Sequence, residues 1–126
     1  MKKQPSLNQS EWQVMELLWQ KPHTLMEMVS ALSQSVGWSK STVATMVRRM
    51  EEKGLISYQE QGKARVFSPN VSLEQVAARE TDSLLHRAYK GSLSLLVNNL
   101  VQRNGLTRDD IDELYAILKQ AEEDAK

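Results

Sequence analysis

The feature that most constrains the fold of this chain is a helix-start signature that occurs five times in its 126 residues. In four cases a Ser, Thr or Asn follows an apolar residue and is itself followed three residues later by a polar side chain and four residues later by an apolar one; the fifth, Thr24, follows His23 instead. Such a capping residue satisfies an unpaired backbone N–H, and apolar residues on both sides of the cap fix how the chain enters the helix. The five capping residues are Asn8, Thr24, Ser39, Ser72 and Thr107. A largely helical chain is therefore expected.

These starts, together with apolar faces of helical period, predict six helices. They span residues 8–20, 24–36, 39–53, 72–90, 92–104 and 107–123. One segment between the third and fourth helices has strand period instead. Ile56 and Tyr58 alternate with polar residues, a polar tip contains Gly62, Val66 follows, and Pro69 ends the pattern. This arrangement predicts a β-hairpin, so the fold class is mainly α-helical with a small β-hairpin (α+β).

Three short helices followed at once by a hairpin is the element order of a winged helix-turn-helix. We therefore expect an N-terminal winged-helix DNA-binding domain at residues 1–70 and a C-terminal helical dimerisation region at residues 71–126. The second and third helices would form the helix-turn-helix around residues 35–38, with the third helix as the reader. Gly54 is expected directly after the end of that helix, where a left-handed residue is needed.

A reading helix must be apolar on one side and able to form hydrogen bonds on the other. The sequence predicts that Val43, Met46, Val47 and Met50 make the inner side. Hydroxyls and free N–H groups in the first turn suit phosphate oxygens, and the later residues suit base edges or phosphates. The predicted DNA-binding residues are Ser39, Lys40, Ser41, Thr42, Thr45, Arg48 and Arg49 on the helix, with Lys63 and Arg65 on the hairpin.

The charge distribution agrees with this division, although the net charge is zero. Residues 1–69 hold nine Lys/Arg and six Asp/Glu, whereas residues 70–126 hold seven and ten. A basic half joined to an acidic half is expected when one part meets phosphate. Glu51, Glu52 and Glu60 oppose phosphate and fit the alternative interpretation, a structural three-helix bundle with an ordinary charged surface.

Other kinds of chemistry find little support. The sequence has no glycine-rich phosphate loop, nucleophile elbow or clustered acid/base pair, so we do not expect an enzyme. It has no cysteine and two histidines. His86 lies four residues after Asp82, a spacing that more often gives an ion pair than a metal site, so no metal site and no cofactor are expected. Without disulfides or a run of about 20 apolar residues, the chain is expected to be cytoplasmic, with no membrane insertion.

Several segments taken in order resemble the penicillinase-repressor family, the winged-helix repressors of bacterial β-lactamase and methicillin-resistance genes. The resemblance covers about residues 7–119, and its most specific parts are the Trp-Ser-x-Ser-Thr-Val and Ala-Tyr-Lys-Gly stretches. The matching segments are Ser10–Met15, Leu18–Trp19, Gly37–Thr45, Arg49–Gly54, Tyr89–Leu93, Leu96–Val101, Leu106–Thr107 and Asp110–Leu114.

This resemblance implies a homodimer that represses transcription by binding a dyad operator in double-stranded DNA. It places the dimer interface in the C-terminal helices, whose apolar stripes a region of about 55 residues cannot easily bury alone. Packing of the same stripes against the chain's own winged helix is the alternative. The predicted dimerisation residues are Leu93, Leu96, Val97, Leu100, Val101, Ile111, Leu114, Tyr115 and Leu118.

The resemblance also implies a mode of induction. Family members linked to antibiotic sensing are inactivated by a regulatory protease pathway that cuts the dimerisation region after an Asn. The matching bond is Asn99–Leu100, where leucine replaces the usual aromatic residue. Ala44 departs from relatives that carry Lys or Arg there, so the operator sequence is expected to differ. The copper-responsive relatives carry paired cysteines, which this chain lacks.

Two further functions remain open from the residues alone. One is a winged-helix regulator that a small-molecule effector releases from DNA by binding between the DNA-binding and dimerisation regions. The other is a helical adaptor whose hairpin contacts protein rather than nucleic acid. A duplex-binding assay separates the adaptor from both regulators.

Overall fold

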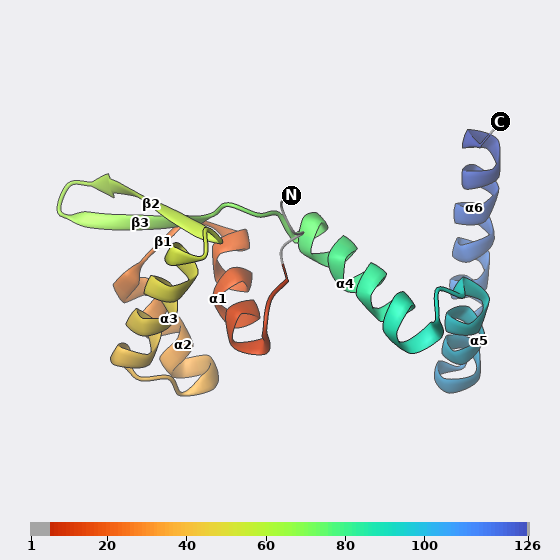
Figure 1. Cartoon of the computed structure of the whole chain (residues 1–126), viewed down its shortest axis with the longest axis horizontal. Coiled ribbons are helices and arrows are strands. Elements are labelled where there is room, and N and C mark those ends of the chain that lie inside the picture. The colour runs from red at the N-terminus through yellow and green to blue at the C-terminus, as the bar shows by residue number, and fades with distance from the viewer. Residues whose placement is uncertain (1–5, 126) are drawn as a thin grey trace. The chain divides into compact units, whose positions relative to one another are not determined.

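The structure is a computed structural model, which describes residues 6–125 apart from the side chain of Asn104. The element order is α1 (Gln9–Gln20), β1 (His23–Thr24), α2 (Leu25–Val36), α3 (Lys40–Glu52), β2 (Ile56–Gln61), β3 (Ala64–Pro69), α4 (Leu73–Tyr89), α5 (Leu93–Asn104) and α6 (Arg108–Asp124). Figure 1 shows how the hairpin follows α1, α2 and α3 and precedes α4, α5 and α6. The chain divides into two compact units, the first extending to Asp82 and the second beginning at Ser83, inside α4.

All five predicted caps form, which explains why the predicted helix ends agree closely with the observed ones. Asn8, Thr24 and Thr107 make complete capping boxes with Glu11, Glu27 and Asp110. The other two caps form as well: Ser39 Oγ accepts from the N–H of Thr42 at 3.2 Å, and Ser72 Oγ accepts from the N–H of Gln75 at 3.1 Å. Because these contacts span three residues, local sequence is sufficient to set them.

The end of α3 is equally local. Gly54 has φ +81°, a left-handed conformation that a Cβ disfavours. Its N–H donates to the carbonyl of Glu51, and the N–H of Leu55 donates to the carbonyl of Met50, both at 3.0 Å. This pair of bonds is the Schellman motif, which stops the helix and turns the chain into β2.

The hairpin β2–β3 carries a third strand that the sequence did not predict. The sheet order is β1-β3-β2, with β1 pairing antiparallel to β3 so that His23 lies opposite Phe67. His23 is buried, and its Nδ1–H donates to the carbonyl of Lys21 at 2.7 Å. Phe67, not Val66, shares the inner face of the hairpin with Ile56, so β3 faces inward one residue later than predicted.

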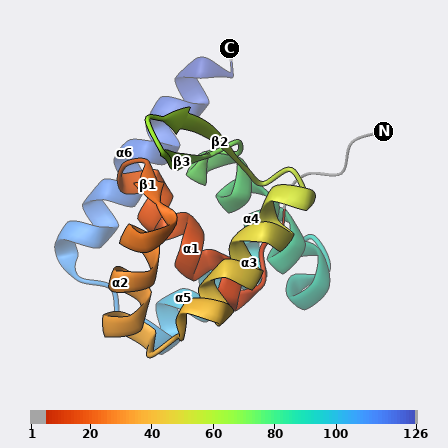
Figure 2. The same ribbon diagram turned by 90° about the vertical axis from the view of Figure 1, so that its left-hand side faces the viewer.

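The hydrophobic core lies entirely in the first unit. Figure 2 shows α1, α2, α3 and the hairpin, the elements that surround it. Val76 on α4 is fully buried and joins this core, so the first turns of α4 belong to the winged helix. Each fully buried aliphatic side chain contributes about 1.5–3 kcal/mol. The buried hydrophobic residues are Leu7, Val14, Met15, Leu18, Met28, Leu32, Val43, Val47, Met50, Leu55, Ile56, Phe67 and Val76.

Candidate nucleic-acid interface

Helix α3 presents one face to the core and another to solvent. Val43, Val47 and Met50 are buried, as predicted. Met46 is only half-buried and reaches the outer side. There it lines a shallow hollow of about 230 Å³ together with Ser41, Thr42, Thr45 and Arg49. The prediction that Met46 lies on the inner side is therefore only partly right, because its long side chain spans the edge of the core.

The predicted DNA-contacting side chains of α3 lie on its open side. Ser39, Lys40, Ser41, Thr42, Arg48 and Arg49 are exposed, and Thr45 is half-buried. The hollow brings Ser41, Thr42, Thr45 and Arg49 together, whereas Arg48 lies outside it. A flexible, polarisable methionine among these polar groups suits contact with an apolar surface such as a thymine methyl group. The sequence missed this because periodicity cannot separate a core position from its edge.

Hydroxyl groups crowd the first turn of α3. Ser39 Oγ lies 3.0 Å from Thr42 Oγ1, to which it donates, and 3.2 Å from Ser41 Oγ. The same Ser39 oxygen accepts from the backbone N–H of Thr42. These bonds hold three short side chains at the N-terminal end of the helix, where the helix dipole favours an anion.

The five predicted DNA-contacting cations lie on α3 and the hairpin. In the part of the chain that the structure describes, no ion pair engages Lys40, Arg48, Arg49, Lys63 or Arg65. All five are exposed. A cation of this kind displaces the counterions that surround DNA when it neutralises a phosphate. This release of counterions is the main source of affinity for the DNA backbone.

An ion pair between an exposed lysine and a buried carboxylate supports the far end of α3. Glu11 on α1 is buried; its Oε1 accepts from the N–H of Asn8 at 3.0 Å, and its Oε2 accepts from Lys53 Nζ at 2.6 Å. Lys53 follows the last residue of α3, so the pair ties the end of this helix to the start of α1. Glu11 was predicted only as a capping partner, because a contact across 42 residues leaves no local signal.

Lys63 and Arg65 are exposed near the tip of the hairpin, on the turn and on β3 respectively. They differ in their surroundings. The guanidinium carbon of Arg65 lies 4.4 Å from the centre of the Tyr58 ring. Tyr58 in turn packs on Phe67, with ring centres 5.6 Å apart. The sequence predicted both cations but not the aromatic contact of Arg65.

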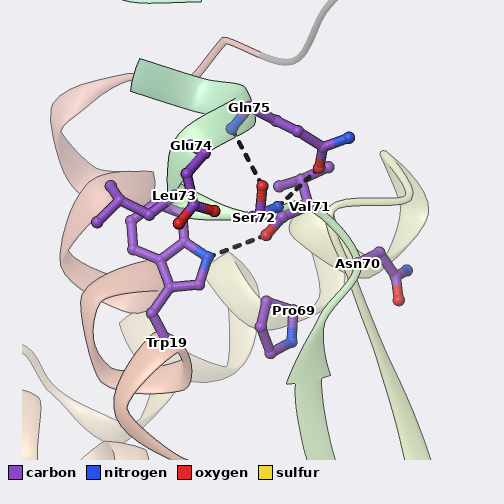
Figure 3. Close-up of a pocket in the computed structure, with 8 residues that line it drawn as sticks. All are labelled: Trp19, Pro69, Asn70, Val71, Ser72, Leu73, Glu74 and Gln75. Atoms are coloured by element: carbon purple, nitrogen blue, oxygen red, sulfur yellow. Dashed lines mark hydrogen bonds between the residues drawn. The ribbon is translucent and has the colours of Figure 1, made fainter. Parts of the chain in front are cut away.

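A hydrogen bond joins the segment between the hairpin and α4 to α1. Figure 3 shows the indole of Trp19 reaching the carbonyl of Val71, and Nε1–H donates to this oxygen at 2.9 Å. Ser72 and Gln75 close the first turn of α4 alongside it. These residues, with Pro69, Asn70, Leu73 and Glu74, line an open hollow of about 570 Å³. Its polar groups are already occupied, since the indole N–H donates to the carbonyl of Val71 and Ser72 and Gln75 are hydrogen-bonded to each other.

The second unit has a different character from the first. No hydrophobic side chain that the structure describes after Val76 is buried. Tyr115 is 71% exposed and Leu118 62%. Among the other predicted dimerisation residues, Leu93, Val97, Leu100, Val101 and Leu114 are exposed, and Leu96 and Ile111 are half-buried. Residues of α5 and α6, including Val97, Leu100 and Leu114, line one hollow of about 420 Å³.

The predicted cleavage bond Asn99–Leu100 lies within α5. Asn99 is half-buried, and its Nδ2–H donates to the Tyr89 hydroxyl at 2.5 Å. Leu100 is 46% exposed. The helical backbone is not the extended form that a protease binds, so cleavage here requires α5 to open.

No helix in the described range, residues 6–125, is both long and apolar enough to cross a membrane. Within the same range, no group of three or more His, Asp or Glu side chains is placed to hold a metal ion.

Comparison with known proteins identifies the family. The profile of the penicillinase repressor family matches residues 7–120. A penicillinase repressor of Bacillus licheniformis is 31% identical over 121 residues, which cover 95% of this chain and 94% of the relative. The methicillin resistance regulatory protein MecI of Staphylococcus aureus (strain N315) is 26% identical over 115 residues, covering 90% and 94%.

Two solution structures resemble the chain with a TM-score of 0.52 and 30% identity, covering 60% of this chain and 93% of theirs. One is the DNA-binding domain of the repressor BlaI, and the other is the Bacillus licheniformis BlaI monomeric form in complex with the blaP half-operator. The predicted α+β winged-helix fold is confirmed, as is the family resemblance. The family consists of transcriptional repressors and not of enzymes, in agreement with the prediction from the sequence. The chain belongs to the penicillinase-repressor family.

Proposed function

We propose that this chain is a transcriptional repressor that binds a dyad operator in double-stranded DNA as a homodimer. The observation that carries the proposal is that α3 and the hairpin carry five exposed cations for which no ion pair is found in the described part of the chain, and that α3 begins with short hydroxyl side chains. The similar BlaI structure in complex with a half-operator supports DNA as the partner. In this proposal α3 enters the major groove and the hairpin contacts the flanking backbone or minor groove. The protein acts in the cytoplasm, where its operator lies.

The test is selection of binding sites from a pool of random duplexes by the full-length protein. An inverted repeat should be enriched, with half-sites about one helical turn apart or a multiple of it. Because Ala44 stands where relatives carry Lys or Arg, we expect the half-site sequence to differ from theirs. Equal binding to all duplexes would reject a specific operator, and absence of binding to any duplex would leave the adaptor as the better interpretation.

Dimerisation by the second unit is supported by its exposed apolar side chains. Leu93, Leu100, Leu114 and Leu118 are each more than 40% exposed, and soluble chains rarely leave so many large apolar groups on one unit without a partner. Two linked winged helices also gain affinity for a dyad, because the second binds at a high local concentration, a gain of about 10²–10⁴.

Induction by cleavage at Asn99–Leu100 is the finer part of the proposal. A cut there falls among the apolar residues of α5 and would separate the DNA-binding half from part of the dimer interface. The experiment exposes cells that contain the protein to a β-lactam and follows both operator occupancy and chain mass. Two fragments that meet at Asn99 should appear as the operator is released. Release while the chain stays full-length would reject cleavage in favour of a directly bound effector.

A further inference from the structure

On the inner face of the hairpin, Phe67, Tyr58 and Arg65 form a continuous row of contacts from the core to solvent, called the stack below, in which the two rings are tilted by 55°. Phe67 is buried, Tyr58 is half-buried and Arg65 is exposed. The strand register places Tyr58 directly opposite Phe67 and Glu60 opposite Arg65, so Arg65 is the diagonal neighbour of Tyr58 on one face. The distances from ring to ring and from ring to guanidinium are 5.6 Å and 4.4 Å.

A guanidinium on an aromatic face keeps its function as a hydrogen-bond donor. The N–H groups of arginine lie in the plane of the guanidinium, so a ring that lies against its flat side leaves the donating edge free. Glu60 lies directly across the strands yet forms no ion pair with Arg65 among the described residues. That edge is therefore open to a phosphate oxygen or to a base edge in the minor groove.

The stack also reduces the entropy that Arg65 loses on binding. A free arginine side chain samples many rotamers and must be ordered when it meets DNA. An arginine already held on Tyr58, which is itself anchored by the buried Phe67, needs less ordering. Lys63, on the turn of the same hairpin, is a matched cation for which no aromatic contact is found in the described part of the chain.

We propose that Tyr58 is a positioning residue for DNA binding, holding the Arg65 guanidinium in place on the hairpin before the operator is met. This inference rests on the proposed function, since it assigns a role within the same DNA-binding face. Tyr58 itself need not touch DNA, and its effect passes through Arg65. A cation–π contact at an exposed site is worth about 0.5–1 kcal/mol, which corresponds to a change of about two- to fivefold in affinity.

The experiment is a double-mutant cycle on the selected operator duplex, measured by fluorescence anisotropy at fixed salt. Tyr58→Leu keeps an apolar contact with Phe67 and removes the aromatic face, whereas Tyr58→Phe keeps the face. We expect Tyr58→Leu to lose about two- to fivefold in affinity and Tyr58→Phe to match the unmodified protein. Tyr58→Leu should cause no further loss in an Arg65→Gln background, but its full loss with Lys63→Gln.

Equal losses in the Arg65→Gln and unmodified backgrounds would overturn the inference while leaving DNA binding intact. Absence of operator binding by the unmodified protein would instead reject the proposed function. A second measurement uses the unmodified protein without DNA, so it does not depend on the folding of a variant. In the free protein, proton NMR should show the Arg65 side-chain resonances shifted upfield by the Tyr58 ring, and unshifted resonances would also overturn the inference.

Discussion

At the scale of single residues, DNA affinity and helix capping depend on different kinds of side chain. Lys63 is exposed on the hairpin turn, where it would act as a point charge toward phosphate. Glu27 is exposed on α2, yet two hydrogen bonds fix it to the cap. Exposure alone does not tell these roles apart. The dependence of DNA affinity on salt and the dependence of folding stability on pH do.

Lys63→Gln should weaken binding to operator and to random duplex by similar factors. A lysine that neutralises one phosphate contributes about one unit to the slope of log affinity against log salt concentration, so that slope should fall by about one. Thr45→Ala should instead alter which operator is preferred, because Thr45 lies in the hollow of α3. An unchanged slope for the combined Lys63→Gln and Arg65→Gln variant would show that the hairpin cations do not contact DNA phosphates.

The carboxylate of Glu27 gives a pH-dependent contribution to folding. The N–H of Thr24 donates to Glu27 Oε1 at 2.7 Å, and this backbone bond is the main cause that lowers the pKa of Glu27 below 4.5. A lowered pKa in the folded state stabilises the fold above the ordinary carboxylate pKa, and this stabilisation is lost as the pH falls through the folded-state value.

Glu27→Gln should therefore lower the free energy of unfolding at neutral pH, and the difference should shrink as the solution is acidified below pH 4.5. Urea unfolding at several pH values measures it. Glu16→Gln, an exposed position within α1 away from the caps, is the control and should show a smaller difference. A difference for Glu27→Gln that stays constant across this pH range would contradict the assignment.

At the scale of elements, contacts distant in sequence hold the helices in place. The ion pair between Glu11 and Lys53 joins α1 to the end of α3, and Trp19 joins α1 to the start of α4. Trp19 also meets Trp12 edge-on, with ring centres 5.5 Å apart. The start of α4 thus depends on one indole donor and on the burial of Val76.

Trp19→Phe keeps most of the aromatic volume and removes the N–H donor to the carbonyl of Val71. Loss of a hydrogen bond of this kind costs about 0.5–1.5 kcal/mol. Amide hydrogen exchange in the first turns of α4 should accelerate by the corresponding factor, since this segment would open more readily. The control is exchange in α3, which has no contact with Trp19 in the described hydrogen bonds and should be unaffected; equal acceleration there would indicate global destabilisation instead.

At the scale of the whole molecule, apolar residues are divided unequally between the two units. The first unit buries a core that runs from Leu7 to Val76, whereas the large apolar side chains of α5 and α6 remain half-buried or exposed. A monomer would leave these groups in water. We therefore expect the second unit to gain stability from a partner in the proposed homodimer.

Leu100→Asp combined with Leu118→Asp should give a monomer in sedimentation equilibrium. The two leucines are 46% and 62% exposed, so their replacement leaves the core of the first unit intact. Burying a leucine contributes about 1.5–3 kcal/mol, and each substitution counts twice in a symmetric dimer. Met26→Asp, at a similarly exposed apolar residue on α2, is the matched control and should remain dimeric. An intact dimer in the double variant would place the interface elsewhere.

The sequence by itself determined the elements whose causes are local. Each cap on α1, α2, α3, α4 and α6 joins residues three apart, and Gly54 ends α3 through bonds within one turn. The helix ends, the hairpin and the cationic face of α3 follow from these signals and from apolar periodicity. The nine predicted DNA-contacting residues all lie on exposed or half-exposed positions of α3 and the hairpin, although their contact with DNA stays a prediction.

Only the tertiary structure decided which distant residues meet. Strand β1 exists because β3 lies beside His23, and Phe67 rather than Val66 faces inward because the register with β2 sets it there. The contacts of Trp19 with Val71 and of Glu11 with Lys53 cross 52 and 42 residues. The stack that places Arg65 on Tyr58 likewise depends on strand register. Such contacts leave no periodic trace in the sequence, because they form only when the whole core brings separate elements together.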